Sequence, residues 1–275
     1  MVCHETYKDE NNNWISPDEL ITKDGKKYLK NDLSKIVKVG PSESMSKSKK
    51  NTIDPENIIN NYGADSVRLF ILSDSPPEKD VQWSEEGIIA SFKFIQKLWS
   101  LHEKVLEEID KNHAKDNGID LIKFTNKFIK KISNNLENFN YNIIVANLHE
   151  MYSYLNKEII KGYQRKTILE NYGKILITMM PILPHLSNEC FENIKKDNDE
   201  INWPIFDENK IKEDFSKIVI QINGRKRGLV NAKLDLLEED LMKLVNDDRN
   251  INKYLINKKI KKKIYIKNKL MNIII

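Results

Sequence analysis

The 275-residue sequence has little cysteine, no long apolar run and almost no net charge. Its two cysteines, Cys3 and Cys190, lie far apart, which argues against a disulfide framework and fits a reducing, cytoplasmic location. No apolar stretch reaches the roughly 18 to 20 residues that a membrane span needs, and no signal-peptide pattern follows Met1. The net charge of +4, from 45 basic and 41 acidic residues, does not by itself establish a nucleic-acid partner.

A metal site is not expected from the histidines and cysteines. Cys3 and His4 are adjacent, but no second Cys/His pair lies near them to complete four zinc ligands, so we interpret them as a partly buried pair at a strand end. His185 follows Pro181-Ile182-Leu183-Pro184 at a helix entry. A packed, hydrogen-bonded histidine is the favoured interpretation there, and a catalytic one is the alternative.

The most distinctive segment is Glu43-Ser44-Met45-Ser46-Lys47-Ser48-Lys49-Lys50-Asn51, which we call the lysine–serine loop. It follows an apolar run at 36–39 and a predicted turn at Gly40-Pro41, and it precedes Asp54-Pro55, which is typical of a helix start. Ammonium groups, hydroxyl groups and backbone N–H groups that nothing regular engages can bind phosphate oxygens. The loop therefore predicts a polyphosphate site, and a solvated surface loop is the alternative.

The central part of the chain has helical periodicity. Residues 1 to about 40 are expected to be loop-rich, with a turn at Glu10-Asn11-Asn12-Asn13. A helix after Asp54 should stop at Gly63, another should cover Ala64–Leu72, and a long one should begin at Ser84. Further helices are predicted at about 119–137, 140–161, 165–180 and 185–196. Their short connections favour an antiparallel bundle.

The end of the chain has a different pattern. From about Asp214, Ile218, Ile220 and Ile222 alternate with polar positions, and Asn223-Gly224 predicts a hairpin. Helices are predicted at 236–245 and 251–256, followed by a hairpin of 263–266 and 270–275 that turns at Asn268-Lys269. This indicates a separate small α+β domain.

Two basic clusters lie in this small domain. Arg225, Lys226 and Arg227 leave the first hairpin, and lysines gather again near the end, at Lys258, Lys259, Lys261, Lys262 and Lys263. If the closing strand pairs near the first hairpin, both clusters could share one face and contact the phosphates of folded RNA. The alternative is a solvated face whose edge-strand lysines discourage aggregation.

The lysine–serine loop resembles the second signature of class I aminoacyl-tRNA synthetases, Lys-Met-Ser-Lys-Ser, and residues 55–70 are similar to the segment that follows it. Met1–Lys8 is similar to the stretch before it in bacterial leucyl-tRNA synthetases, and the resemblance extends over the whole chain. One position departs from the pattern, because Ser44 stands where the family usually has lysine. Lys47, the second lysine of the signature, is present.

The resemblance implies a mainly α fold: a helical bundle like the anticodon-binding domain of class I synthetases, preceded by the end of a Rossmann-type catalytic domain and followed by a small α+β domain. The expected divisions are 1–53 for the catalytic end with its signature loop, 54–83 for a stem-contact helical region, 84–213 for the tRNA-binding bundle and 214–275 for the C-terminal tRNA-binding domain. The implied reaction is ATP-dependent attachment of leucine to its tRNA through a leucyl-adenylate.

The resemblance also assigns residue roles. Lys47 is the candidate catalytic residue, and Met45, Ser46, Ser48 and Lys49 would complete the ATP-binding loop, with Mg²⁺ as the usual companion of the triphosphate. Arg68 would lie near the acceptor stem, although a surface ion pair with Asp65 is an equal alternative. The tRNA-binding candidates are Arg68, Arg225, Lys226, Arg227, Lys261, Lys262 and Lys263.

Several alternatives stay open. Isoleucine, valine and methionine enzymes share the loop and the bundle, although Met1–Lys8 and the hairpin at 219–224 favour leucine. The chain could also be a non-catalytic tRNA-binding module or one subunit of a split synthetase that binds a missing N-terminal part. Because no His-Ile-Gly-His signature or glycine-rich nucleotide fold is present, the chain is interpreted as a C-terminal piece that makes no leucyl-adenylate alone.

Overall fold

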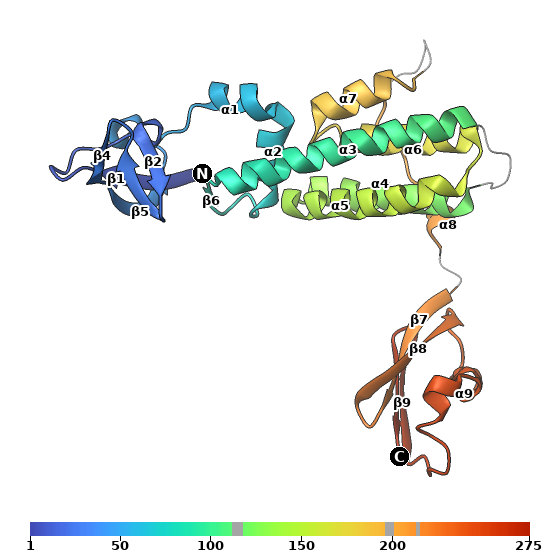
Figure 1. Ribbon diagram of the computed structural model, residues 1–275. Helices are drawn as coiled ribbons and strands as arrows, with labels where there is room; N and C mark the ends of the chain where they lie inside the picture. The colour runs from blue at the N-terminus through green and yellow to red at the C-terminus, as the bar shows by residue number, and fades with distance from the viewer. Residues whose placement is uncertain (112–117, 196–200, 213–214) are drawn as a thin grey trace. The chain divides into compact units, whose positions relative to one another are not determined.

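The computed structural model describes residues 1–111, 118–195, 201–212 and 215–275, which fall into two compact units (Figure 1). The N-terminal unit is Met1–Lys210 and the C-terminal unit is Ile211–Ile275. Within the described ranges, no helix has both the length and the apolar character that a membrane crossing requires.

Two small sheets form the start of the N-terminal unit. One has the order β5-β1-β6, in which β1 (Val2–Lys8) pairs antiparallel with β5 (Lys38–Ser44) and parallel with β6 (Val81–Gln82). The other has the order β2-β3-β4, formed by Leu20–Lys23, Lys26–Leu29 and Asp32–Ile36 after a short 3₁₀ turn, η1 (Pro17–Glu19). The expectation that residues 1–40 are loop-rich is therefore wrong. The missed signal was Asp24-Gly25, whose φ angles of 50° and 73° make the β2–β3 turn.

The predicted turn at Gly40-Pro41 is also wrong, because β5 continues through it. The β1–β5 register shifts between Glu5 and Tyr7, which marks a bulge, and the Thr6 hydroxyl donates to the Pro41 carbonyl at 3.1 Å. A Cβ at Gly40 would lie 2.5 Å from the Thr6 hydroxyl oxygen, so glycine allows the close approach. Proline is tolerated at such a bulge in an edge strand.

The two predicted helices after the loop are confirmed. Helix α1 (Pro55–Tyr62) begins with the Asp54 carboxylate accepting from the Glu56 N–H group at 3.0 Å. Gly63, at φ 80°, separates α1 from α2 (Ala64–Ser73). A small core that includes Phe70, Val81 and Ile88 joins these helices to β6 and to the start of α3.

The helical bundle agrees closely with the sequence prediction. Ser84 accepts from the Gly87 N–H group at 3.2 Å at the start of α3 (Glu85–Lys111), and α4 (Ile119–Glu137) has the predicted bounds. Helix α5 (Tyr141–Glu158) continues into η3 (Ile159–Lys161), and α6 (Arg165–Met179) ends one residue early. Helix α7 (Pro184–Glu192) ends before the predicted limit, residue 196, which lies outside the described residues. Fully buried aliphatic side chains, including Val105, Ile144, Leu148 and Ile175, form the core.

The C-terminal unit is a four-stranded sheet with two helices, preceded by a short helix, α8 (Glu208–Ile211). The strand order is β8-β7-β10-β9, and the first hairpin turns at Asn223 and Gly224, whose φ angles are 48° and 76°. Both predicted hairpins are confirmed, whereas α9 begins two residues later than expected; the predicted domain start at Asp214 lies outside the described residues. The elements are β7 (Phe215–Ile222), β8 (Arg225–Lys233), α9 (Glu238–Asp247), α10 (Arg249–Asn252), β9 (Lys262–Ile266) and β10 (Leu270–Ile274).

Candidate functional site

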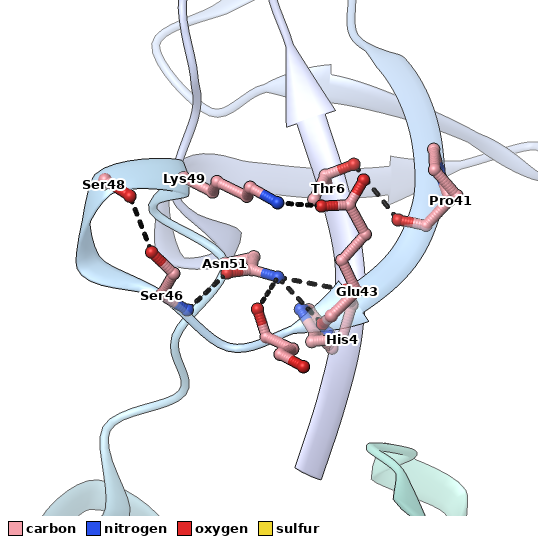
Figure 2. A network of polar contacts seen from close by, with 9 residues as sticks. His4, Thr6, Pro41, Glu43, Ser46, Ser48, Lys49 and Asn51 are labelled. Atoms are coloured by element: carbon pink, nitrogen blue, oxygen red, sulfur yellow. Dashed lines mark hydrogen bonds and ion pairs between the residues drawn. The ribbon is translucent and has the colours of Figure 1, made fainter. Parts of the chain in front are cut away.

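The lysine–serine loop leaves the end of β5 and makes one short 3₁₀ turn, η2 (Lys47–Lys49). Lys50 closes this turn at φ 52°, and its N–H group donates to the Lys47 carbonyl at 3.2 Å. The hydroxyl groups of Ser46 and Ser48 are 2.7 Å apart (Figure 2). The Lys47 side chain is exposed, and no ion pair holds it within the described parts of the chain. Its ammonium group is therefore available to an anion.

Lys49 behaves differently from Lys47. Its ammonium group reaches back to β5 and forms an ion pair with the Glu43 carboxylate (Figure 2). The two side chains are 40% and 36% exposed, so solvent weakens the pair and it can exchange. Lys49 is one of the predicted ATP-binding residues, and in this conformation its charge is already matched by Glu43.

Asn51 is the residue of this site that sequence reasoning missed. Its side chain is fully buried, and its Oδ1 accepts from the Ser46 N–H group at 2.8 Å. Its Nδ2 faces the carbonyl oxygens of His4 at 3.2 Å, Glu43 at 3.2 Å and Ser44 at 3.4 Å (Figure 2). The amide thus joins the loop to both β1 and β5. Nothing in the sequence marks this residue except its place at the loop end.

The sequence interpretation assumed that the backbone N–H groups of the loop are free, but three of them are already hydrogen-bonded. The Met45 N–H group donates to the Val2 carbonyl at 3.3 Å, which extends the β1–β5 pairing by one bond. The Ser46 and Lys50 N–H groups are engaged by Asn51 and Lys47. The side chains of the loop consequently carry more of any phosphate binding than the backbone does.

Cys3 and His4 lie in β1 beside the loop. Cys3 pairs with Ser44 and is buried, whereas the half-buried His4 ring meets Tyr7 edge to face at 5.8 Å. Burial lowers the pKa of His4 below its ordinary value. Their interpretation as a partly buried strand pair is confirmed.

Arg68 and Asp65 do not form the surface ion pair that was one alternative, since Arg68 binds the turn between α6 and α7 and Asp65 binds the first turn of α7. The Arg68 guanidinium group donates to the carbonyls of Ile182 at 3.1 Å and Pro181 at 2.7 Å. The buried Asp65 carboxylate accepts from the Leu186 N–H group at 2.8 Å and from the His185 ring at 2.9 Å. His185 is hydrogen-bonded as predicted, but its side chain is 74% exposed, so it is not packed.

The two basic clusters of the C-terminal unit lie at opposite edges of the sheet, the first on β8 and the second on β9 and the segment just before it. Arg225 of β8 and Lys263 of β9 share one register row, with the buried Ile222 and Ile273 between them. Three strand spacings of about 4.8 Å separate β8 from β9, or about 14 Å. The clusters therefore flank the sheet and do not merge into one patch.

Some members of these clusters are already engaged. Lys263 forms an ion pair with Glu238 at 2.9 Å, and the Arg227 guanidinium group stacks over the Tyr254 ring at 4.3 Å. The members that are exposed and make no ion pair within the described ranges are Arg225, Lys226, Lys258, Lys259, Lys261 and Lys262.

Comparison with known proteins agrees with this fold and loop. A family model described as the anticodon-binding domain of tRNA ligase matches residues 119–270, which is 152 of 275 residues, and a model of class I tRNA synthetases (I, L, M and V) matches residues 26–84. The chain therefore belongs to the tRNA ligases that carry this anticodon-binding domain.

Within that class the relatives are leucine–tRNA ligases. Those of Orientia tsutsugamushi (strain Boryong) and Bartonella quintana (strain Toulouse) are 39% and 36% identical over all of this chain and 33% of each relative. The resemblance to leucyl-tRNA synthetases is confirmed, and the chain spans about a third of the length of these curated relatives. The ternary LeuRS–tRNA–LeuAMS crystal structure of Agrobacterium radiobacter K84 agnB2 shares the fold, with a TM-score of 0.68 and 20% identity over 84% of this chain and 30% of that chain.

Proposed function

We propose that this chain serves as the C-terminal portion of a leucine–tRNA ligase, which attaches leucine to tRNA(Leu) in an ATP-dependent reaction through a leucyl-adenylate. The observation that carries the proposal is the exposed Lys47, which makes no ion pair with any residue that the structure describes and stands on a loop that Asn51 and the Glu43–Lys49 pair hold in place. Matches to leucine–tRNA ligases along the whole chain support it.

In the first step the leucine carboxylate attacks the α-phosphorus of ATP, and the bond to the departing pyrophosphate breaks. Negative charge grows on that pyrophosphate, and the Lys47 ammonium group would stabilise this charge more strongly in the transition state than in the bound substrate. Ser46 and Ser48 would exchange their mutual hydrogen bond for phosphate oxygens. In the second step a ribose hydroxyl of tRNA attacks the leucyl carbonyl of the leucyl-adenylate, and AMP leaves. ATP is expected to arrive with Mg²⁺ as its companion.

The catalytic role of Lys47 can be tested in an enzyme in which this chain is joined to the remaining two thirds of a leucine–tRNA ligase. We expect Lys47→Ala to slow ATP–pyrophosphate exchange by about 10² to 10³-fold, the usual effect of removing one transition-state donor, with leucine binding nearly unchanged. Lys38→Ala is the matched control, because Lys38 is an exposed lysine of β5 outside the loop. Equal exchange rates for Lys47→Ala and the parent enzyme would refute the role.

The proposal assigns tRNA binding to the part of the chain that follows the lysine–serine loop. Residues 1–53 would be the end of a Rossmann-type catalytic domain, 54–83 the stem-contact region, 84–213 the tRNA-binding bundle and 214–275 a second tRNA-binding domain. In the last of these, the tRNA-binding candidates that stay exposed and make no ion pair among the described residues are Arg225, Lys226, Lys261 and Lys262. Arg68 is a weaker candidate, since two backbone carbonyls already hold its guanidinium group.

Binding of tRNA by the chain itself has a salt-based test. Each phosphate contact that is lost should make the slope of log K against log[salt] shallower by about 0.7 to 0.9. We expect the double variant Lys261→Ala, Lys262→Ala to make the slope shallower by nearly twice that amount, because it removes two phosphate contacts. Lys263→Ala is the control and should change it less, because Glu238 already pairs with Lys263. Salt-independent binding by the parent chain would contradict the assignment.

A further inference from the structure

The buried amide of Asn51 stands where the lysine–serine loop meets the ends of two strands. Its partners belong to three segments: His4 in β1, Glu43 and Ser44 in β5, and Ser46 in the loop. Because β1 and β5 pair His4 with Glu43, their carbonyls meet at one point of the sheet. Three carbonyl oxygens on one side and an N–H group on the other leave one orientation for the amide, with Nδ2 toward the strands.

We propose that Asn51 is a positioning residue, whose amide fixes the lysine–serine loop to the ends of β1 and β5 and so determines where the Lys47 ammonium group stands. The loop has only one other side-chain tie to the sheet within the described residues, the half-exposed Glu43–Lys49 pair. An exposed pair of this kind exchanges with solvent, whereas the Asn51 side chain has no exposed surface. The catalytic part of this inference rests on the proposed function, but the structural part does not.

Only glutamine carries the same amide, and its extra methylene group would displace the donor and acceptor atoms. Leucine has a similar branched shape with bulkier methyl groups, and it leaves the Ser46 N–H group and the strand carbonyls without the amide. An ionised aspartate keeps an acceptor for Ser46 but turns a negative oxygen toward the carbonyls of His4, Glu43 and Ser44. A protonated aspartic acid offers one donor and one acceptor, and therefore restores part of the amide pattern.

This difference gives the test a pH signature. Backbone hydrogen exchange is measured on the full chain as the protection factor of the Ser46 amide, which corrects for the intrinsic pH dependence. In Asn51→Leu we expect about a tenfold or greater loss of protection at both pH 8 and pH 5. In Asn51→Asp we expect a similar loss at pH 8 and a recovery at pH 5. Asn57→Leu, at an exposed position of α1, is the control and should change neither value.

Three results of the hydrogen-exchange measurement would contradict the proposed role of Asn51. Unchanged Ser46 protection in Asn51→Leu, or no recovery of Asn51→Asp at pH 5, would overturn the hydrogen-bonding role. An equal loss at the buried amides of α4 would show a general defect in folding and would also overturn it.

A kinetic measurement links the loop to catalysis. In the joined enzyme, Asn51→Leu should lower kcat for ATP–pyrophosphate exchange by about tenfold or more, with the KM for leucine unchanged. An unchanged kcat would overturn the catalytic part of the inference. If Lys47→Ala leaves exchange unaltered, the proposed role of Lys47 fails, and the hydrogen-exchange results still decide whether Asn51 holds the loop.

Discussion

A buried carboxylate of α2 caps the start of α7. Leu183 occupies the N-cap position of α7 and has no side-chain group to accept from the first N–H groups. Asp65 of α2 does this from a distance, with bonds of 2.8 Å to the Leu186 N–H group and 3.4 Å to the His185 N–H group, and it is 6% exposed. A hydrogen bond to a charged acceptor contributes about 1.5 to 3 kcal/mol, and the longer one contributes less. The exposed His185 ring adds little.

We therefore expect Asp65→Ala to lower the free energy of unfolding of the N-terminal unit by about 3 kcal/mol. Asp65→Asn keeps one acceptor and should cost about half as much. All four tryptophans of the chain lie in the N-terminal unit, so tryptophan fluorescence in urea follows this unit alone. Glu189→Ala is the matched control, because it removes an exposed carboxylate from α7 and should stay within about 0.5 kcal/mol. A loss below about 1 kcal/mol for Asp65→Ala would show that the cap is dispensable.

Three further outcomes follow from buried groups. Burial lowers the pKa of His102, which contacts Tyr172, so on acidification the unfolded chain binds the proton before the folded chain does. The free energy of unfolding should therefore decrease as the pH is lowered from about 6.5. In urea titrations, His102→Gln should reduce this decrease. Burial raises the pKa of Cys190 to about 12, so a disulfide reagent at pH 8 should label it only after unfolding, as counted by mass spectrometry. A Cβ at Gly228 would lie 2.5 Å from Ile251, so Gly228→Ala should cost about 1 to 3 kcal/mol in the C-terminal unit, measured by circular dichroism.

The helices could be predicted because their signals are local. Asp54 and Ser84 make the capping bonds that their positions indicated, and Gly63 has the positive φ that ends α1. The bundle helices have long apolar stripes that repeat at helical spacing, and the bounds of α4 could be read from this pattern without error. Asn223-Gly224 likewise determines its hairpin from two residues. In each case the residues that determine where the element begins or ends are close neighbours in the sequence.

The features that were missed depend on contacts between distant segments. Strands β2 to β4 are short and largely exposed, so their alternation is weak, and Pro41 suggested a turn where the structure has a bulge opposite Thr6. The partners of Arg68 are 113 and 114 residues away. The role of Asn51 could not be read from the sequence either, because it depends on the His4 carbonyl, 47 residues earlier.

The two side-chain ties of the lysine–serine loop have different consequences for its charge. The Glu43–Lys49 pair holds the loop but also cancels one of its three positive charges, whereas the Asn51 amide holds it without changing the charge. Lys47 and Lys50 keep exposed ammonium groups, so the loop remains cationic while it is anchored. A bound polyphosphate could also draw Lys49 from Glu43, because that pair is weak in solvent. Ser44 supplies no charge where the family pattern has a lysine, and its contact with the Asn51 amide is through the backbone carbonyl, which any residue at this position would offer.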